Sequence, residues 1–185
     1  MRSGYKHYQN RSEPGDIVFV TTTVLDFVYA FADPMLAEQM TLHLFRQHER
    51  HRAALHAFVV MGHHIHLLTR LPAHLTVSHF VRRVKASAGK DIKVLLDTRQ
   101  AAKFDDQRGL NDRQFWKRSF RSVVVPEGKM FAQKVWYIHN NPVKANLCKR
   151  PAEYRWSSAC LFEGGCWDDE KGLSIEDWLR LAPPA

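Results

Sequence analysis

The stretch ALHAFVVMGHHIHLLT (residues 54–69) decides the fold, because it contains two predicted β-strands and the turn between them. Residues 54–61 and 64–69 are rich in the β-branched and apolar side chains that strands favour. Gly62 stands between the two runs, at the position of a tight turn. The pattern predicts a β-hairpin, and the flanking segments should supply the rest of its sheet.

Outward from this hairpin, strand patterns alternate with amphipathic helices. Asp33 followed by Pro34 is typical of a helix start, with an N-cap residue and a proline at the first helical position. Pro126 opens a later helix in the same way. In chain order, the other predicted elements are a strand at 16–24, a helix from 34 to about 50, a helix over 77–92, a loop at 97–112, a strand at 115–125 and a short helix at 175–181.

The order of elements, β-α-β-β-α-β-α, predicts an α+β fold. Its first six elements form a split βαβ arrangement of the ferredoxin-like kind, with a four-stranded antiparallel sheet and helices on one face. No linker rich in Gly, Pro or Ser divides the chain. We therefore expect one domain over residues 1–161 and a C-terminal extension, residues 162–185, packed on that same domain.

The composition is that of a basic globular protein. Of the 185 residues, 45% are hydrophobic and 25% are charged, which disfavours low-complexity disorder. Lys and Arg number 27 against 19 Asp and Glu, and the net charge is +8. A basic excess of this size points to a polyanionic partner, of which nucleic acid is the commonest.

The three cysteines, Cys148, Cys160 and Cys166, match neither a disulfide framework nor a zinc knuckle, so we expect reduced thiols. The N-terminal segment has basic residues without an apolar run behind them, which is not a signal-peptide pattern. No stretch approaches the ~18 apolar residues of a membrane span. The expected location is the cytoplasm, with no membrane contact.

The tripeptide His64-Ile65-His66 lies in the second strand of the hairpin. Side chains at i and i+2 project from the same face of a strand, so the two imidazoles lie side by side while Ile65 points into the core. Such a pair suits one metal ion but needs at least one further ligand. The alternative is two histidines on a solvated strand face. By the same alternation, His63 is expected on the opposite face.

Tyr137 and Asn141 are four residues apart and share a face of the third predicted helix, and Lys134 extends the same stripe. A tyrosine beside an apolar stripe is usually only a half-buried aromatic. Asn141 could be only a cap, because it precedes Pro142, where the helix should bend or end. His139 lies on another side of the helix and should face away from Tyr137.

The histidine pair on a strand, followed by Tyr-x-x-x-Asn-Pro on a later helix in a basic split-βαβ domain, is a specific combination. It resembles the single-tyrosine HUH transposases of insertion sequences, and among them the REP-associated tyrosine transposases. The likeness extends from about residue 16 to residue 161, and His63 departs from the small polar residue usual there. The matching blocks are FVVMGHHIHLL (58–68), FWKRSF (115–120), YIHNNPVKANL (137–147) and EYRWSSA (153–159).

This resemblance implies a metal-dependent endonuclease that cuts and rejoins single-stranded DNA in DNA transposition or recombination. Tyr137 would be the nucleophile and form a 5′-phosphotyrosine intermediate. His64, His66 and Asn141 would bind the metal ion, Mg²⁺ or Mn²⁺. The implied substrate is hairpin-forming repeat DNA, and both a monomer and a homodimer are compatible with the resemblance.

Basic side chains are expected to hold the phosphates of the substrate. Phe115 and Trp116 could stack on unpaired bases, although one of two adjacent aromatic residues in a strand normally faces the core. The residues predicted to contact DNA are Arg82, Arg83, Lys85, Arg118, Arg121 and Lys144.

Two other functions stay open at the level of sequence. A domain descended from a transposase could bind nucleic acid without cutting it. A metal-dependent phosphodiesterase could use water as its nucleophile, with Tyr137 in a structural role. The complete set of His64, His66, Tyr137 and Asn141 argues against the first of these.

Overall fold

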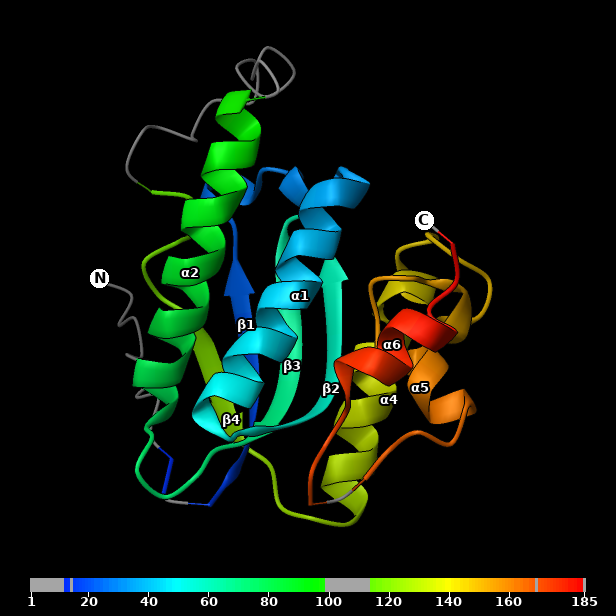
Figure 1. Cartoon of the computed structure of the whole chain (residues 1–185). Coiled ribbons are helices and arrows are strands. Elements are labelled where there is room, and N and C mark those ends of the chain that lie inside the picture. The colour runs from blue at the N-terminus through cyan, green and yellow to red at the C-terminus, as the bar shows by residue number, and fades with distance from the viewer. Residues whose placement is uncertain (1–11, 14, 99–113, 169, 185) are drawn as a thin grey trace, which may run out of the picture.

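The computed structural model describes residues 12–13, 15–98, 114–168 and 170–184. One antiparallel sheet with strand order β2-β3-β1-β4 forms the centre of the fold (Figure 1). Its strands are β1 (Ile17–Thr23), β2 (Ala54–Met61), β3 (His64–Arg70) and β4 (Arg121–Val124). Helix α1 (Pro34–His51) lies between β1 and β2 in the chain, and α2 (Val77–Thr98) follows β3. This is the predicted ferredoxin-like α+β fold.

The predicted hairpin of β2 and β3 is confirmed. Met61 lies opposite His64, so the turn consists of Gly62 and His63 alone. A Cβ atom on Gly62 would come within 2.6 Å of the Tyr29 ring, so glycine is needed there for close packing. The turn is further held by a hydrogen bond from the Phe31 amide to the Gly62 carbonyl (2.9 Å).

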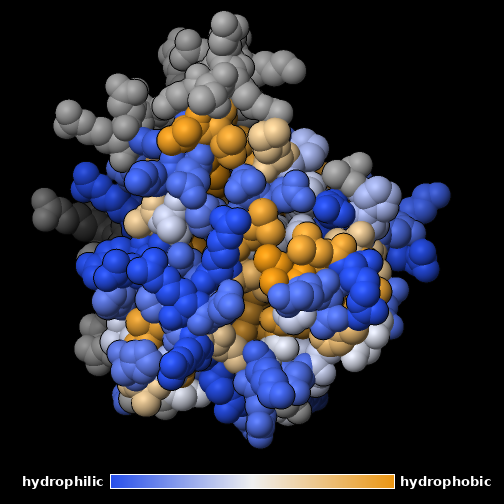
Figure 2. Space-filling model, viewed as in Figure 1, coloured by the Kyte–Doolittle hydropathy of each residue, from blue (hydrophilic) through white to orange (hydrophobic). Residues whose placement is uncertain are grey.

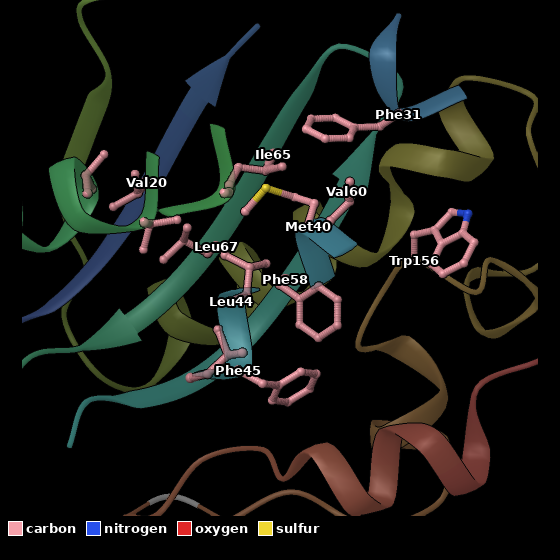
Figure 3. Close-up of a cluster of buried hydrophobic side chains, with 14 of the residues drawn as sticks. Val20, Phe31, Met40, Leu44, Phe45, Phe58, Val60, Ile65, Leu67 and Trp156 are labelled. Atoms are coloured by element: carbon pink, nitrogen blue, oxygen red, sulfur yellow. The ribbon is translucent and has the colours of Figure 1, made fainter. Parts of the chain in front are cut away.

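Helices α1 and α2 cover one face of the sheet, as predicted, and enclose the larger hydrophobic core (Figure 1). The N-cap of α1 is the predicted one, since the Asp33 carboxylate accepts a hydrogen bond from the Met35 amide (2.9 Å). Figure 3 shows side chains of α1 meeting those of β2 and β3 in this core. The labelled members are Val20, Phe31, Met40, Leu44, Phe45, Phe58, Val60, Ile65, Leu67 and Trp156.

The third long helix, α4 (Lys129–Lys144), lies on the opposite face. Its buried residues Val135 and Ile138 join a second, smaller core with Val59 of β2 and Leu68 of β3. The expectation of helices on one face therefore holds for α1 and α2, and α4 covers part of the other face. Helix α4 follows the six elements of the βαββαβ pattern. That pattern therefore does not predict which face of the sheet α4 covers.

The segment after α4 returns to the outer edge of β2. The Val60 amide donates to the Trp156 carbonyl (2.8 Å), and Val59 forms an isolated bridge with Ser157. Further on, the Leu173 amide donates to the Leu55 carbonyl (2.8 Å). These contacts occupy backbone groups that an edge strand would otherwise present to other chains.

The C-terminal elements are η3 (Pro151–Glu153), α5 (Ala159–Glu163) and α6 (Ile175–Leu181). Trp178 of α6 is fully buried and belongs to the larger core. Its ring lies 6.1 Å from that of Phe45 and 6.3 Å from that of Trp156. The short helix predicted at residues 175–181 is confirmed, and it packs against the same core as α1.

The predicted strand over residues 115–125 is wrong for its first half, because regular pairing begins only at Arg121. The Lys85 ammonium group reaches this segment and donates to the carbonyls of Lys117, Arg118 and Ser119. Backbone pairing in the first half is limited to an isolated bridge between Trp116 and Val24. The contact from Lys85, on a helix distant in the chain, is not visible in the local pattern of this segment.

Two further expectations need correction. Helix α4 does not end at Asn141 but continues through Pro142 to Lys144. The predicted loop at 97–112 begins later, since Asp97 and Thr98 are still helical, and its remainder lies outside the described residues.

The described helices include none that is long and apolar enough to cross a membrane. The three cysteines are free thiols, as predicted. Figure 2, in the orientation of Figure 1, shows hydrophilic residues gathered over α2, whereas apolar residues reach the surface nearer the centre of the view.

Candidate active site

The two histidines of the His-x-His pair lie side by side on β3, as strand alternation predicts. Their ring centroids are 4.7 Å apart. Ile65 between them is fully buried in the core under α1 and α2, while the histidines face α4. His64 is half-buried and His66 is buried. The pair therefore occupies the face of the sheet that is only partly covered.

His66 is oriented by neighbours on β1. Thr21 is its direct partner in the antiparallel pairing, and the Thr21 hydroxyl lies 2.7 Å from His66 Nδ1. The Phe19 ring stacks on the imidazole with centroids 5.3 Å apart. With Nδ1 engaged by Thr21, Nε2 is the nitrogen left for a ligand outside the sheet. This arrangement matches metal-binding histidines, whose second nitrogen is usually held by a hydrogen bond.

Both imidazoles are neutral at physiological pH. Burial, with the charge of His63, lowers the pKa of His64 to about 4. Burial, followed by the charges of His64 and Lys134, lowers the pKa of His66 to about 3. A neutral imidazole has the free lone pair that a metal ion requires. The site thus keeps two nitrogen donors in the form that can bind a cation.

Tyr137, which is 71 positions after His66 in the chain numbering, is brought by α4 against this pair. Its ring centroid lies 5.4 Å from that of His66 and 5.8 Å from that of Phe19, in edge-on contacts. The tyrosine is half-buried, so its ring packs on the sheet while the residue keeps access to solvent.

Two lysines flank Tyr137 on α4, Lys134 one turn before it and Lys144 two turns after it. The Lys134 ammonium group lies 5.7 Å from the centre of the Tyr137 ring, and that of Lys144 lies 5.6 Å from it. Lys134 also lies over the Phe19 ring at 4.8 Å. Positive charge on both sides of the tyrosine favours the approach of an anion such as a phosphodiester.

Asn141 lies on the same face of α4 as Tyr137. Its side-chain amide nitrogen donates to the Tyr137 carbonyl (2.6 Å), which leaves the amide oxygen as the group able to accept or coordinate. Asn141 and His64 line one cavity of about 600 Å³. Asn141 is therefore not a helix cap, because α4 continues to Lys144, and its amide lies next to the histidine site.

The residues present fit a divalent metal ion in two respects. The buried His64 Nδ1 has no hydrogen-bond partner among the described residues, so this imidazole has unused bonding capacity. Two imidazoles and one amide oxygen also form a donor set that divalent ions accept. Among the described residues, no three His, Cys, Asp or Glu side chains are placed so that they could hold one metal ion, so an ion here would depend on the amide oxygen and on substrate oxygens.

Two histidines were expected to point away from this site, with opposite outcomes. His139 does so, and its Nε2 is 2.8 Å from the Ser158 hydroxyl in the interior. His63 does not, because it lies in the turn and strand alternation does not apply there. Its ring is 4.5 Å from that of His64 and 4.8 Å from that of Tyr29.

The basic residues predicted to contact DNA are divided between two places. Arg121 lies opposite Thr21 in the sheet, and directly paired residues point to the same face, so it is exposed on the His66 side. Lys144 lies on the same side. Arg82, Lys85 and Arg118 instead line a groove of about 700 Å³ between α2 and residues 114–120, together with Lys90, Lys93 and Lys117.

The basic side chains on and near α2 differ in how available they are to contact a phosphate. Arg82 and Arg118 are exposed, and Arg83 on α2 donates to the His79 ring (3.1 Å). The Lys85 ammonium group is already occupied by the three carbonyls described above, and burial lowers its pKa to about 8. Phe115 and Trp116 are both buried, so neither presents a free ring for base stacking, contrary to our expectation.

Sequence reasoning missed Thr21, and it gave Lys134 no role in the site. The run of three threonines at 21–23 was visible as part of a strand, but its partner was not. Only the register of β1 against β3 places the Thr21 hydroxyl on His66. Lys134 could have been found, because its position one turn before Tyr137 follows from helix spacing.

Comparison with solved structures supports the fold. A REP-associated tyrosine transposase bound to a REP hairpin is similar over 100% of this chain and 99% of its own, with a TM-score of 0.61 and 15% identity. A predicted transposase of Deinococcus radiodurans R1 is 18% identical over 76% of this chain and 97% of its own, with a TM-score of 0.48. No curated protein matches the sequence.

Comparison with protein families is more specific. The family described as "Transposase IS200 like" matches residues 28–141, which is more than half of the chain. The match includes the β2–β3 hairpin with its histidine pair and α4 as far as Asn141. On this evidence, the chain belongs to the family of IS200-like transposases.

Proposed function

We propose that this protein cuts and rejoins single-stranded DNA, with Tyr137 as the nucleophile. One observation carries the proposal: α4 packs the Tyr137 ring against His66, next to His64, although helix α2 and strand β4 separate the tyrosine from the histidines in the chain. The separate motifs therefore form one site. Membership of the IS200-like transposase family supports a DNA-cleaving role for it.

The chemistry we propose is a transesterification. The Tyr137 hydroxyl oxygen bonds to the scissile phosphorus, and the bond from phosphorus to the 3′ oxygen breaks. The tyrosine proton passes to solvent, and the departing oxygen takes up a proton to become a free 3′ hydroxyl. The product is a 5′-phosphotyrosine. Because the phosphodiester is exchanged and not hydrolysed, attack by another 3′ hydroxyl rejoins DNA in the reverse step.

His64, His66 and Asn141 would hold the divalent ion, Mg²⁺ or Mn²⁺. Such an ion, when bound, supplies Lewis-acid stabilisation of charge on the phosphate oxygens. Thr21 and Phe19 keep the His66 ring in place without rearrangement. Lys134 and Lys144 provide further positive charge around the Tyr137 ring. A tyrosine hydroxyl is a weak nucleophile at neutral pH, so this surrounding charge is needed.

The proposed substrate is a DNA strand that folds into a hairpin. The similar solved structure of a REP-associated transposase has a REP hairpin bound, and its fold is that of this chain. The groove lined by Arg82 and Arg118 offers a second basic surface, separate from the site, that would bind backbone phosphates of the hairpin. The charges nearer the site, Arg121 and Lys144, would hold the strand to be cut.

The proposal can be tested by incubating wild type and Tyr137→Phe with hairpin-bearing single-stranded oligonucleotides in Mn²⁺ or Mg²⁺. Wild type should form a covalent protein–DNA adduct with a free 3′-hydroxyl fragment, and the variant should form none while it still binds the hairpin. Cleavage by the Phe variant would favour a water-using phosphodiesterase. Tight binding by wild type without any nicking would favour a non-catalytic binding domain.

A further inference from the structure

A cavity of about 600 Å³ adjoins the candidate active site at the turn end of the β2–β3 hairpin. His64 and Asn141 form the side of the cavity that it shares with the site. The other sides come from the segment before α1, from the C-terminal end of α4 and from residues 154–156. Tyr137 does not line it. A molecule in this cavity would thus be next to the reacting groups without displacing the nucleophile.

The walls of the cavity are aromatic and mostly fixed. Phe31 and Trp156 line it and are buried in the larger core. Tyr154 also lines the cavity, and its hydroxyl donates to the Val60 carbonyl (2.9 Å). This hydrogen bond holds the Tyr154 ring in place. Tyr29 differs from these three, because 57% of it is exposed. It therefore presents an open aromatic surface at the mouth.

The segment that carries Tyr29 has a strained backbone. Asp26 and Phe27 both have positive φ angles, 50° and 58°, which are rare for residues other than glycine and rarer for a bulky aromatic. The Lys117 ammonium group lies 3.2 Å from the centre of the Phe27 ring. Strain of this kind persists only where surrounding contacts maintain it, and it gathers at ligand sites.

Polar groups complete the lining. The buried His63 Nδ1 has no hydrogen-bond partner among the described residues, and its ring packs on Tyr29. Lys144, exposed at the same cavity, adds positive charge where a backbone phosphate would pass. Aromatic surfaces, hydrogen-bonding groups and a cation are together the features that bind an unpaired nucleotide.

We propose that this cavity holds the unpaired nucleobase of a nucleotide next to the scissile phosphate, stacked on Tyr29. The proposal rests on the proposed function, because it takes the phosphate to lie at His64, His66 and Tyr137. Inserting the base would fix the strand so that one phosphodiester, and no neighbouring one, meets the nucleophile. The cavity would then contribute to the choice of the cleavage position.

Fluorescence of 2-aminopurine tests the stacking without requiring cleavage. The probe is a hairpin oligonucleotide with 2-aminopurine placed at successive positions of its single-stranded flank, bound to Tyr137→Phe without metal. One position should be quenched on binding. Tyr29→Ala should abolish that quenching, and Tyr29→Phe should retain it, because phenylalanine keeps the ring. Quenching at no position, or quenching unchanged in Tyr29→Ala, would overturn the proposal.

A chemical deletion of the base tests its effect on cutting. Wild type should lose about tenfold or more in single-turnover cleavage when the quenched position is made abasic. Tyr29→Ala should show a similar loss on the intact strand and little further loss on the abasic one. The control Leu179→Ala, an equally exposed apolar residue on α6, should cleave both strands as wild type does.

The two proposals fail in different ways. If wild type cuts intact and abasic strands equally well, the nucleobase site is wrong and the proposed function stands. If no adduct forms with any hairpin oligonucleotide but 2-aminopurine is quenched in a Tyr29-dependent way, the base site stands and the cleavage chemistry is wrong.

Discussion

The two faces of the central sheet are built from the same strands but differ in how completely they are covered. On one side α1 and α2 enclose a large apolar core that includes Val20, Ile65 and Leu67. On the other side α4 covers β2 and β3 with a smaller cluster, and Arg121 of β4 stays exposed. The partly covered face carries the histidine pair, and the closed face carries none of the candidate catalytic groups.

This difference shows how a small domain separates stability from function. In a strand, alternate side chains belong to different faces, so one β3 residue can pack the core while its neighbours keep a reactive site. The uncovered part of the sheet lies beside Thr21 and Arg121, and under the proposed function it would give a DNA strand access to the histidines. A second helix layer as complete as that of α1 and α2 would have closed this access.

The largest expected effect comes from neighbouring residues on opposite faces, His64 and Ile65. His64→Ala should reduce cleavage roughly a thousandfold or more, because it removes a proposed metal ligand, with a smaller loss of hairpin affinity. Ile65→Ala should instead lower the free energy of unfolding by about 2–5 kcal/mol and leave cleavage by the folded fraction nearly intact. Chemical denaturation and single-turnover assays on both variants check this. Equal losses of cleavage and affinity in His64→Ala would contradict the metal assignment.

The adjacent threonines of β1 provide a second test of the same division. Thr21→Val removes the partner of His66 Nδ1, so the affinity for Mn²⁺ should fall about 10- to 100-fold. Thr22 points to the closed face, where its hydroxyl is buried without a hydrogen-bond partner among the described residues. Thr22→Val should therefore be neutral or raise the free energy of unfolding by about 1 kcal/mol. Calorimetric titration with Mn²⁺ and chemical denaturation distinguish the effects of the two variants. Weaker Mn²⁺ binding in Thr22→Val would argue against the separation of a metal-binding face from a core face.

Acid should destabilise both faces through buried histidines. Burial lowers the pKa of His48, on α1 against the closed face, and of His139, on α4, to about 4 in each case. Between pH 6.5 and about 4 the unfolded chain therefore binds more protons than the folded one. The free energy of unfolding should then fall as the pH decreases, by at most about 1.4 kcal/mol per pH unit for each histidine. Denaturation across this range should show a shallower slope for His139→Gln. The exposed His74→Gln is the control, and equal slopes in all three proteins would refute the prediction.

The smallest effects are expected from single surface charges. Arg121→Gln, beside the site, should lower the rate of adduct formation at saturating DNA a few-fold. Arg118→Gln, in the groove along α2, should weaken hairpin binding a few-fold and reduce its salt dependence by about one phosphate contact, without changing that rate. Filter binding at several salt concentrations and single-turnover kinetics measure both. Identical effects of the two variants would mean that the two basic surfaces do not have separate roles.

Much of the fold was predictable because its signals are local. The glycine turn and the Asp33-Pro34 helix start depend on residues within one turn of the chain. Three predictions failed, the first because a distant side chain intervened, the second because strand alternation ends at the turn, and the third because of packing. Lys85 of α2 binds the carbonyls after Trp116 in place of a longer strand, and the turn carries His63 to the side of His64. Helix α4 also continues past Asn141, because packing outweighs the cost of an internal proline.

By itself, the sequence determined which candidate groups share a face: alternation joins His64 to His66, and helix spacing joins Tyr137 to Asn141. These relations follow from the periods of the strand and the helix and need no knowledge of the rest of the chain. Only the tertiary structure decided that α4 lies on the histidine face, that Thr21 holds His66 and that an aromatic cavity adjoins the site. The reason is physical, because register and helix placement depend on contacts between segments far apart in the chain, which local periodicity does not encode.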